Sequence, residues 1–417
     1  MEYKLEEIKE QAEYCLNCKN KPCQTGCPLQ NSIPDFIKSI KEENYEEAFK
    51  ILSKTTIFEP ICGRICPHKS QCEGSCVRGI KGESVHIGKL EAFVGDYMLE
   101  HIDLQVTEAD DESKKVAIIG SGPSGLACSY YLSTRGVKVD IYERHSKLGG
   151  LLRHGIPEFR LEKDILDKWL EKYILNKNVT AFTNMELGKD ILLEDLKNDY
   201  DAVVLAFGAN SSNKMNVEGE EKEFVLGGNE LLEYGNMPDF TDKKVAVIGG
   251  GNVAMDTSRT IKRLGAKEVK VVYRRAEKQM PAERKEIEEA KREGIEFLFQ
   301  TNMIKVLDHK IECVKTELIK KEGETREYPV NVEGSNFFMD VDFVILAVGS
   351  TTDKETVDKL GLETNKWGYI NVDESCRASD DKVYAIGDLA GNKQTVAWAA
   401  RSGVECAKQI TNLTKTK

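Results

Sequence analysis

The spacing of apolar residues predicts helices in the first hundred residues of the chain. Apolar side chains recur three or four positions apart at Ile33, Phe36, Ile37, Ile40, Ala48, Phe49 and Leu52. This period places them on one face of an α-helix. The pattern therefore predicts a helix over residues 33–52, and a similar pattern predicts another over 87–99.

From residue 115 onward the apolar residues form short runs of strand length. Lys115–Ile119 leads into a glycine turn and a helix-like segment at 126–132, and Lys244–Ile248 begins a very similar unit. Further strands are predicted over 137–143, 202–206, Glu268–Tyr273 and 341–348. Strands that alternate with helical segments indicate an α/β architecture with parallel sheets. The repeated unit indicates two nucleotide-binding domains rather than one.

Composition is that of an ordinary globular enzyme of more than one domain. Of the 417 residues, 40% are hydrophobic and 31% are charged, and the net charge of -11 argues against a nucleic-acid binder. The first fourteen residues lack the apolar core of a signal peptide, and no run reaches the roughly 18 apolar residues of a membrane span. We therefore expect a cytoplasmic protein without a membrane partner, in a compartment where structural disulfides are rare.

The first glycine turn matches a dinucleotide-binding fingerprint. Gly120 permits a tight turn, Gly122 lets a pyrophosphate approach the backbone, and Gly125 allows close helix packing. The next helix would offer free amides to the phosphates. Glu143 ends the following strand, where a carboxylate can accept hydrogen bonds from a ribose. The fingerprint alone often marks only a loop, but strand, helix and acid together predict a nucleotide site.

A C-terminal segment favours FAD at this first turn. An apolar strand at residues 384–386 ends in Gly387 and Asp388. In flavoproteins with two dinucleotide domains, such a segment returns to the first domain, where the aspartate binds the flavin ribityl chain. A helix beginning near Thr395 would direct its positive end at the flavin ring. Without the two fingerprints, this segment would be an ordinary strand, turn and helix.

The second glycine turn points to NADP(H). Gly249, Gly251 and Ala254 match the same fingerprint, with alanine in the helix-packing position. The next strand ends in Arg274 and Arg275, where NAD-specific sites carry an acid. Arginine can pair with a 2′-phosphate that an acid would repel. The alternative is a pair of solvent-facing basic residues at a strand end.

Eight of the twelve cysteines lie in one N-terminal block. They are Cys15, Cys18, Cys23, Cys27, Cys62, Cys66, Cys72 and Cys76. Thiolates suit zinc or iron–sulfur clusters, and zinc sites normally use paired C-x2-C units, of which this block has one. Prolines follow the fourth and sixth of these cysteines, as in ferredoxin-type runs. We expect two iron–sulfur clusters, since a flavin can accept the two electrons of a hydride and pass them singly to one-electron carriers. Structural zinc is the rival interpretation.

The chain resembles the small (beta) subunit family of NADPH-dependent glutamate synthase. The resemblance runs from Cys15 to about residue 409 and rests on the motifs at 62–67, 149–157, 249–256 and 273–282. The same modules are similar to the large subunit of the electron-bifurcating ferredoxin:NADP oxidoreductase and to part of dihydropyrimidine dehydrogenase. The resemblance implies a hetero-oligomer in which NADPH reduces FAD and electrons leave through two [4Fe-4S] clusters to a larger redox subunit.

The resemblance also implies how the cysteines divide. One cluster takes Cys15, Cys18, Cys23 and Cys76, and the other takes Cys27, Cys66 and Cys72 with Glu91 as its fourth ligand and Cys62 packed nearby. On ligand softness alone, Cys62 is the simpler fourth ligand. Both possibilities stay open at this point.

The expected fold is α/β, with two Rossmann-like dinucleotide-binding domains of glutathione-reductase type preceded by a helical double-cluster iron–sulfur domain. The expected domains are 1–110 for iron–sulfur, 111–227 and 344–417 for FAD, and 228–343 for NADPH. Cofactor contacts are expected from Gly120, Gly122, Pro123, Ser124, Gly125, Glu143, Arg144, Gly150, Leu151, Gly208, Gly249, Gly251, Asn252, Val253, Ala254, Asp256, Arg274, Arg275, Gly387, Asp388 and Thr395. No side chain is expected to act as a catalytic acid or base.

Several activities are disfavoured. Residue 2 is glutamate, whereas the glutaminases of this system use an N-terminal cysteine, so the chain should not hydrolyse glutamine. The other four cysteines, Cys128, Cys313, Cys376 and Cys406, are isolated in sequence and are expected to be buried apolar residues. Three interpretations remain: a glutamate synthase subunit, the FAD/NADP subunit of a ferredoxin:NADP or dihydropyrimidine-reducing complex, and a zinc-stabilised nucleotide-binding scaffold.

Overall fold

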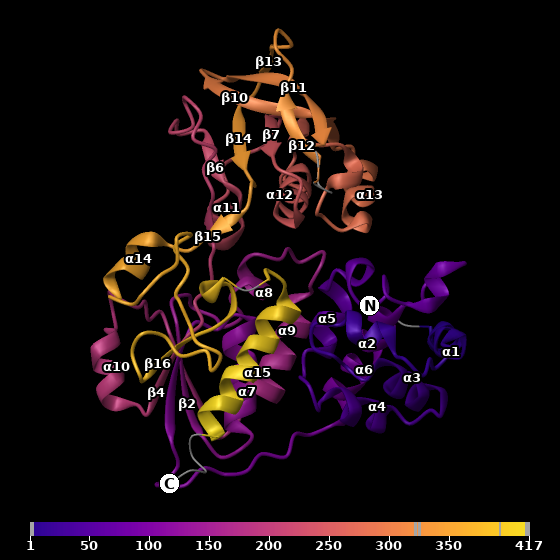
Figure 1. Cartoon of the computed structure of the whole chain (residues 1–417), viewed down its shortest axis with the longest axis vertical. Coiled ribbons are helices and arrows are strands. Elements are labelled where there is room, and N and C mark those ends of the chain that lie inside the picture. Colours follow the sequence, from indigo (N-terminus) through magenta and orange to yellow (C-terminus); the bar gives the residue numbers. More distant parts are fainter. Residues whose placement is uncertain (1–3, 321–322, 324–326, 392, 413–417) are drawn as a thin grey trace. The chain divides into compact units, whose positions relative to one another are not determined.

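The computed structural model describes residues 4–320, 323, 327–391 and 393–412 (Figure 1). The chain forms two compact units. Unit 1 comprises Met1–Arg153, Glu158–Gly208 and Thr352–Lys417, and unit 2 comprises His154–Pro157 and Ala209–Thr351. The cysteine-rich region and the first dinucleotide domain therefore belong to one compact unit. The finer boundaries that the sequence predicts stay a prediction.

The cysteine-rich region of unit 1 is helical. Its elements are α1 (Leu5–Tyr14), α2 (Pro22–Gly26), α3 (Ile33–Lys41), α4 (Tyr45–Leu52), α5 (Glu59–Ile65), η1 (His68–Ser70), η2 (Val77–Ile80) and α6 (Ile87–His101). The single helix predicted over 33–52 is wrong, because the chain breaks into α3 and α4. Glu43 has a φ of 55°, outside the helical region, and the Asn44 side chain accepts a hydrogen bond from the Glu47 amide to start α4.

The rest of unit 1 is a parallel sheet with helices. Its elements are β1 (Lys115–Ile119), α7 (Pro123–Ser133), β2 (Lys138–Glu143), α9 (Lys163–Trp169), a π-helical turn η3 (Leu170–Ile174), β3 (Val179–Thr183), α10 (Leu193–Asp199), β4 (Ala202–Leu205), α14 (Lys354–Lys359), β16 (Val383–Ala385), η5 (Gly387–Ala390) and α15 (Val396–Asn412). The strand order is β16-β4-β1-β2-β3, and every neighbouring pair is parallel. Helix α8 (Leu151–His154) follows the diglycine and ends in unit 2.

Unit 2 contains a second parallel sheet of the same kind. Its elements are β5 (Ser211–Ser212), β6 (Val225–Gly227), α11 (Gly228–Tyr234), β7 (Lys244–Ile248), α12 (Asn252–Arg263), β8 (Glu268–Tyr273), η4 (Glu277–Gln279), α13 (Arg284–Arg292), β9 (Glu296–Phe299), β14 (Phe343–Leu346) and β15 (Ser350–Thr351). The strand order is β6-β14-β7-β8-β9. Strands β1 and β7 are thus the central strands of two equivalent sheets, and each leads into a glycine turn.

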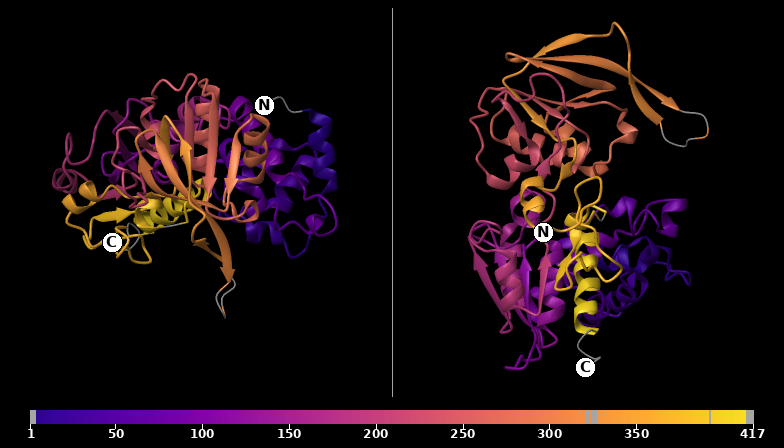
Figure 2. Two further views of the ribbon diagram at one scale, coloured as in Figure 1. Left: turned by 90° about the horizontal axis from the view of Figure 1, so that it is seen from above. Right: turned by 60° about the vertical axis from the view of Figure 1, so that its left-hand side comes forward.

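An antiparallel sheet is also part of unit 2 and departs from the parallel pattern expected from sequence. It consists of β10 (Thr301–Leu307), β11 (Lys310–Lys320), β12 (Glu327–Asn331) and β13 (Phe337–Asp340), and β11 pairs with the other three (Figure 2). Its inner face packs Met303, Ile311 and Cys313 against the back of the parallel sheet. The α/β fold class is confirmed, with this addition.

Buried apolar residues fill both faces of each parallel sheet. In unit 2, for example, Val247 and Val271 face one cluster, while Ala246 and Val272 face the other. This alternation follows from the period of two along a strand. Among the described residues, no helix is both long and apolar enough to cross a bilayer.

Candidate functional site

The first glycine turn connects β1 to α7 in the geometry that the fingerprint predicts. Gly120 has a φ of 100°, and a Cβ on it would lie 2.7 Å from the carbonyl oxygen of Ala206, so the position requires glycine. A Cβ on Gly122 would meet nothing nearer than 4.0 Å. The backbone at Gly122 is therefore open to a group such as a pyrophosphate.

Glu143 lies at the end of β2 and is buried against this turn. Its Oε2 accepts hydrogen bonds from the Ser121 amide (3.0 Å) and the Ser121 hydroxyl (2.5 Å), and its Oε1 accepts one from the His145 amide (2.9 Å). The carboxylate therefore also holds the turn in shape. Each oxygen has further lone-pair capacity, so binding of a ribose hydroxyl by Glu143 stays a prediction.

The diglycine segment packs on the same turn. Gly150 has a φ of 48°, and a Cβ on it would lie 2.6 Å from the Cα of Gly122. The Gly149 amide donates to the Ser121 hydroxyl over 2.9 Å. Leu151 then begins α8, and Arg144 is exposed at the end of β2. The fold thus brings the predicted residues 120–125, 143–144 and 150–151 together.

The C-terminal strand returns to this site. Strand β16 pairs with β4, and a Cβ on Gly387 would lie 2.6 Å from the Ser124 hydroxyl oxygen. The Oδ1 of Asp388 is buried and has no hydrogen-bond partner among the described residues, and burial raises the pKa of this carboxyl to about 7. A buried acceptor without a donor fits a flavin whose ribityl hydroxyls would donate to it.

Helix α15 starts beside this segment. The Thr395 carbonyl accepts from the Ala399 amide (2.9 Å), and its hydroxyl accepts from the Trp398 amide (3.4 Å), so Thr395 caps the helix. Figure 1 shows α15 beside α7, and a Cβ on Gly403 of α15 would lie 2.1 Å from the Ser124 carbonyl oxygen. Gly208, also predicted as a contact, follows β4 with a φ of 77°.

The second glycine turn repeats the geometry of the first within unit 2. Gly249 has a φ of 146°, and a Cβ on it would lie 2.1 Å from the carbonyl oxygen of Ala347. A Cβ on Gly251 would meet no atom nearer than the Cγ of Pro281, at 4.0 Å. Ala254 is fully buried, as expected of the helix-packing position, whereas Val253 is only half-buried.

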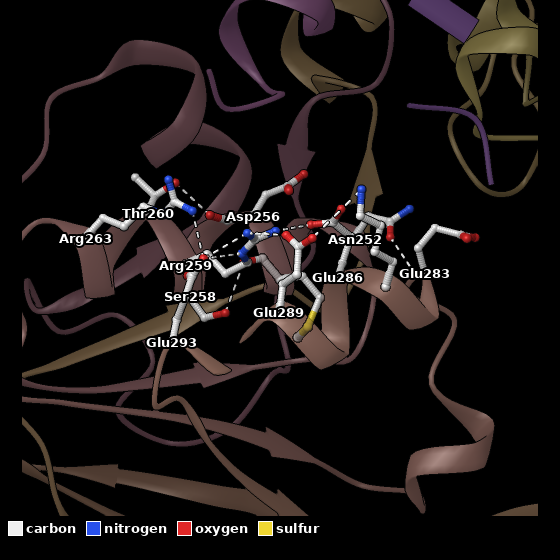
Figure 3. Close-up of polar contacts among 12 residues, drawn as sticks. Asn252, Asp256, Ser258, Arg259, Thr260, Arg263, Glu283, Glu286, Glu289 and Glu293 are labelled. Atoms are coloured by element: carbon white, nitrogen blue, oxygen red, sulfur yellow. Dashed lines mark hydrogen bonds and ion pairs between the residues drawn. The ribbon is translucent and has the colours of Figure 1, made fainter. Parts of the chain in front are cut away.

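A loop at residues 280–283 closes against this second turn. The Ala282 amide donates to the Gly250 carbonyl oxygen (3.1 Å), and the Glu283 amide donates to the Asn252 side-chain oxygen (3.0 Å). Asn252 therefore holds the loop as well as beginning α12. Asp256, one turn further along α12, is buried in the same region (Figure 3).

Arg274 and Arg275 differ in how the fold uses them. Their carbonyl oxygens accept from the Thr316 hydroxyl (2.8 Å) and the Gln300 amide (3.0 Å), which fixes the backbone and leaves both side chains for other contacts. Arg274 is exposed, but the Nε of Arg275 is buried without a hydrogen-bond partner among the described residues. A buried guanidinium donor of this kind fits a phosphate group.

Sequence reasoning missed a buried ionic cluster behind the second turn. Arg259 of α12 is almost fully buried and forms ion pairs with Glu286 and Glu289 (2.6 Å) of α13 and with Glu293 (2.9 Å), the residue that follows this helix (Figure 3). The cluster ties α13, and with it the loop at 280–283, to α12. The sequence signal was three acids at helical spacing over residues 286–293, but nothing local identified their partner.

Four of the block cysteines line one open pocket. Cys15, Cys18, Cys23 and Cys76, the four that the resemblance assigns to one cluster, surround about 350 Å³ of space, counted to its open mouth. Leu16 and Val77 form part of the wall and are exposed. Burial raises the pKa of Cys23 to about 11 and also raises that of Cys15. Four thiols around an open space fit a cluster that would need them as thiolates.

The remaining block cysteines form an interior group around Glu91, in which Cys62 and Cys72 are buried and Cys27 and Cys66 are partly buried. Burial and the nearby Glu91 carboxyl raise the pKa of Cys27 to about 12, and the same two causes raise that of Cys72. Burial also raises the pKa of Glu91 to about 8, while its Oε1 accepts from the Asn31 side-chain amide (3.2 Å). Cys62 is hydrogen-bonded to Cys66, which with burial raises the pKa of Cys62.

The positions of the described side chains do not form a binding site for a single metal ion. Among the described residues, no group of three or more His, Cys, Asp or Glu side chains could hold one metal ion. A four-iron cluster spreads its ligands over four metal atoms. Assignment of individual cysteines to iron stays a prediction.

The segments that carry the interior cysteine group contact the first dinucleotide domain. The Trp169 indole of α9 donates to the Ile57 carbonyl oxygen (2.8 Å), and its ring contacts Phe58 with centroids 4.7 Å apart. These two residues immediately precede α5, which carries Cys62. Arg401 of α15 donates to the carbonyl oxygen of Pro28, next to Cys27, over 3.1 Å.

Comparison with known proteins covers both parts of the chain. Residues 114–403 match the family "Pyridine nucleotide-disulphide oxidoreductase", and residues 1–102 match "Dihydroprymidine dehydrogenase domain II, 4Fe-4S cluster". The chain is 34% identical to the glutamate synthase [NADPH] small chain of Escherichia coli, over 97% of this chain and 91% of that one. It is 36% identical to the NADP(+)-dependent formate dehydrogenase subunit beta of Moorella thermoacetica, over 93% of this chain but 59% of that one.

Solved structures show the same fold. Mycobacterium tuberculosis FprA in complex with NADPH aligns with a TM-score of 0.63 at 20% identity, over 73% of this chain and 85% of that one. The predicted two-domain dinucleotide-binding fold and the predicted resemblance are both confirmed.

Proposed function

Because the chain belongs to the pyridine nucleotide-disulphide oxidoreductase family and to the family of glutamate synthase small chains, we propose that it is the electron-input subunit of a larger redox enzyme. It is an NAD(P)H-dependent oxidoreductase with flavin, NADP and iron–sulfur cofactors. Its task would be to oxidise NADPH and deliver electrons singly to the partner. The glutamate synthase large chain is the partner we propose.

The observation that carries this proposal is the division of the cysteine block into two groups within one compact unit. One group lines an open pocket, and the other surrounds Glu91 on segments that contact the first dinucleotide domain. We therefore propose two [4Fe-4S] clusters. When bound, FAD would accept the two electrons of a hydride and release them one at a time, and the clusters would carry these single electrons.

The interior group would be the nearer of the two to the flavin. It is connected to the first dinucleotide domain through the Trp169 and Arg401 hydrogen bonds, and Arg401 lies on the helix that Thr395 caps. The pocket group, with Leu16 exposed at its wall, would be the exit toward the partner. In this order, electrons would pass from the flavin to the interior group, then to the pocket group, and then to the partner.

Glu91 is our choice for the fourth ligand of the interior group. The Cys62 thiol is hydrogen-bonded to Cys66, and this contact raises the pKa of Cys62, as expected when Cys62 keeps its proton and donates it. A donor to a ligating sulfur is a supporting role, and it leaves the last ligand position to the Glu91 carboxyl. Asn31 would orient that carboxyl.

In unit 2, the chain's own residues would select and hold NADPH. The open backbone at Gly251 and the start of α12 would accept the pyrophosphate, and Arg275 would pair with the 2′-phosphate. Arg274 would add a second, solvent-facing positive charge.

Anaerobic purification from the native source tests the proposal. We expect a brown complex with about eight irons and one FAD per chain, in company with a glutamate synthase large chain. A colourless or plain yellow protein containing zinc would favour the scaffold interpretation. A ferredoxin-linked, pyrimidine-reducing or formate-oxidising companion would keep the electron-input role and reject glutamate synthase as the partner.

A further inference from the structure

Three cysteines outside the N-terminal block come together in unit 1. Cys128 lies on α7, Cys406 lies on α15, and Cys376 lies in the segment before β16. The Cys406 thiol is hydrogen-bonded to both of the others. The contact follows from the crossing of the two helices, since a Cβ on Gly403, one turn before Cys406, would lie only 3.0 Å from the Cys128 amide nitrogen.

The expectation that these cysteines are isolated and buried is correct only in part. Cys128 and Cys406 are fully buried, but Cys376 is half-exposed and in contact with Cys406. No sequence spacing could show this, because the three thiols come from segments far apart in the chain.

Cys376 is held in an unusual backbone conformation. Its φ of 65° lies in the left-handed region, which few residues other than glycine and asparagine adopt. Two hydrogen bonds fix it there: its amide donates to the Asp373 carbonyl oxygen, and its carbonyl oxygen accepts from the Ala385 amide, each over 3.0 Å. Such strain persists where the surroundings determine it, and it is more frequent at functional positions.

The two contacting thiols are chemically unequal. The hydrogen bond from Cys406 lowers the pKa of Cys376, although burial and the charges of Glu405 and Asp373 oppose that change. The contacts with the other two thiols, together with burial, raise the pKa of Cys406 well above its usual value. Cys376 is therefore the more nucleophilic sulfur and the one that solvent can reach, while Cys406 retains its proton.

We propose that Cys376 and Cys406 form a reversible oxidation site whose substrate is hydrogen peroxide. The Cys376 thiolate attacks one peroxide oxygen, the O–O bond breaks, and the departing hydroxide takes a proton to become water. Cys376 is then a sulfenic acid, oxidised by two electrons. Cys406 attacks that sulfur, the S–O bond breaks, a second water leaves with the Cys406 proton, and a disulfide remains. This site is independent of the cluster cysteines and of the proposed partner.

The disulfide would join the segment before Gly387 and Asp388 to α15. Both of these elements contact Ser124 of the first glycine turn, so the disulfide would link two parts of the first dinucleotide domain. Cys128 contacts Cys406 too, but it is fully buried, and a peroxide would have to reach it through packed helices. The initial attack is therefore assigned to Cys376.

Peptide mass spectrometry of the anaerobically purified holoprotein tests the site. After treatment with hydrogen peroxide, free thiols are alkylated and the digest is searched for linked peptides. We expect a Cys376–Cys406 linked peptide that dithiothreitol releases, with the alkylation of both residues lost together. Cys313, a buried cysteine of unit 2 that contacts no other described thiol, should keep its reactivity and serves as the internal control.

Two variants separate the steps. Cys406→Ser should halt the reaction at the Cys376 sulfenic acid, which a dimedone probe would label, and Cys376→Ser should leave Cys406 reduced. A Cys128–Cys406 linkage in the wild type would overturn the assignment. So would oxidation of Cys376 to sulfinic acid without any loss of Cys406 alkylation. The wild-type experiment decides the question even if a variant fails to fold.

Discussion

The two dinucleotide-binding regions share one topology but differ in the charged side chains near the end of their second strand, where one has an acid and the other has two arginines. In both, the central strand leads into a glycine turn whose first glycine lies against a backbone carbonyl, of Ala206 in one and Ala347 in the other. In unit 1 the second strand ends in Glu143, a buried acid bonded to the turn itself. In unit 2 the corresponding strand ends in Tyr273, and two residues further on Arg275 has a buried Nε with no partner among the described residues.

This difference separates what builds a turn from what selects its ligand. Glu143 is already engaged by the protein, so its loss should harm the fold first. Arg275 holds nothing in the described structure through its Nε, so its loss should harm only the choice of cofactor. We therefore expect a mainly structural role for Glu143 and a role in cofactor selection for Arg275.

The largest effect is expected at the first glycine of each turn. Gly120→Ala and Gly249→Ala would each place a Cβ against backbone, at 2.7 and 2.1 Å, with an unsuitable φ. We expect destabilisation on the order of 3 kcal/mol, with loss of FAD from the first variant and of NADPH binding from the second. Thermal unfolding and FAD absorbance measure both effects. In the matched controls, Gly122→Ala and Gly251→Ala, the fold should survive while the ligand is excluded; equal unfolding in all four would contradict this account.

Arg275→Ala should break the selectivity of unit 2. Loss of a charge-assisted contact to the 2′-phosphate should raise the KM for NADPH by roughly 10- to 100-fold while leaving the KM for NADH almost unchanged. Steady-state reduction of an artificial electron acceptor provides the measurement. Arg292→Ala, an exposed arginine at the end of α13, is the control. If the NADPH/NADH preference is retained in Arg275→Ala, the assignment fails.

Glu143→Gln should destabilise the first glycine turn. The glutamine amide can accept fewer hydrogen bonds than the carboxylate. Its NH2 group is a donor and would face the Ser121 amide and hydroxyl, which also donate. We expect a loss of about 1–3 kcal/mol in the stability of unit 1 and weaker retention of FAD. Urea unfolding followed by flavin fluorescence checks it. An unchanged midpoint, with only FAD affinity reduced, would make Glu143 a ligand contact rather than a support.

The smallest expected effect is a pH dependence that belongs only to the first site. Burial raises the pKa of Asp388 to about 7, and a hydroxyl donor from the flavin would lower it again. FAD binding would then release a proton, so affinity should rise with pH toward about 7 and level off above it. Asp388→Asn should remove this slope. Equilibrium dialysis of FAD at several pH values tests it, and a slope that persists in the variant would place the proton elsewhere.

Local signals in the sequence were sufficient for the two turns. Their first glycines are required by positive φ angles and by the carbonyl oxygens that follow the neighbouring strand of the sheet. Any parallel α/β unit of this kind forms such a sheet, so the fingerprint carries most of the information. The helix predicted over 33–52 failed because Glu43 and Asn44 leave the helical region, while the apolar period continues across the break. The antiparallel strands β10–β13 went unrecognised because their apolar residues do not keep to one face: Phe337 and Met339 pack toward the core, whereas Phe338 between them is exposed.

The sequence by itself determined the two dinucleotide units, the acid and arginine that distinguish them, and the presence of a thiol-rich N-terminal block. Each of these depends on residues close together in the chain. The family resemblance implied how the block cysteines divide, and the tertiary structure places four of them around an open pocket and the others around Glu91. Only the tertiary structure decided that Arg259 is enclosed by three glutamates. It alone brought Cys128, Cys376 and Cys406 together, because contacts between distant segments depend on how helices and strands pack rather than on spacing along the chain.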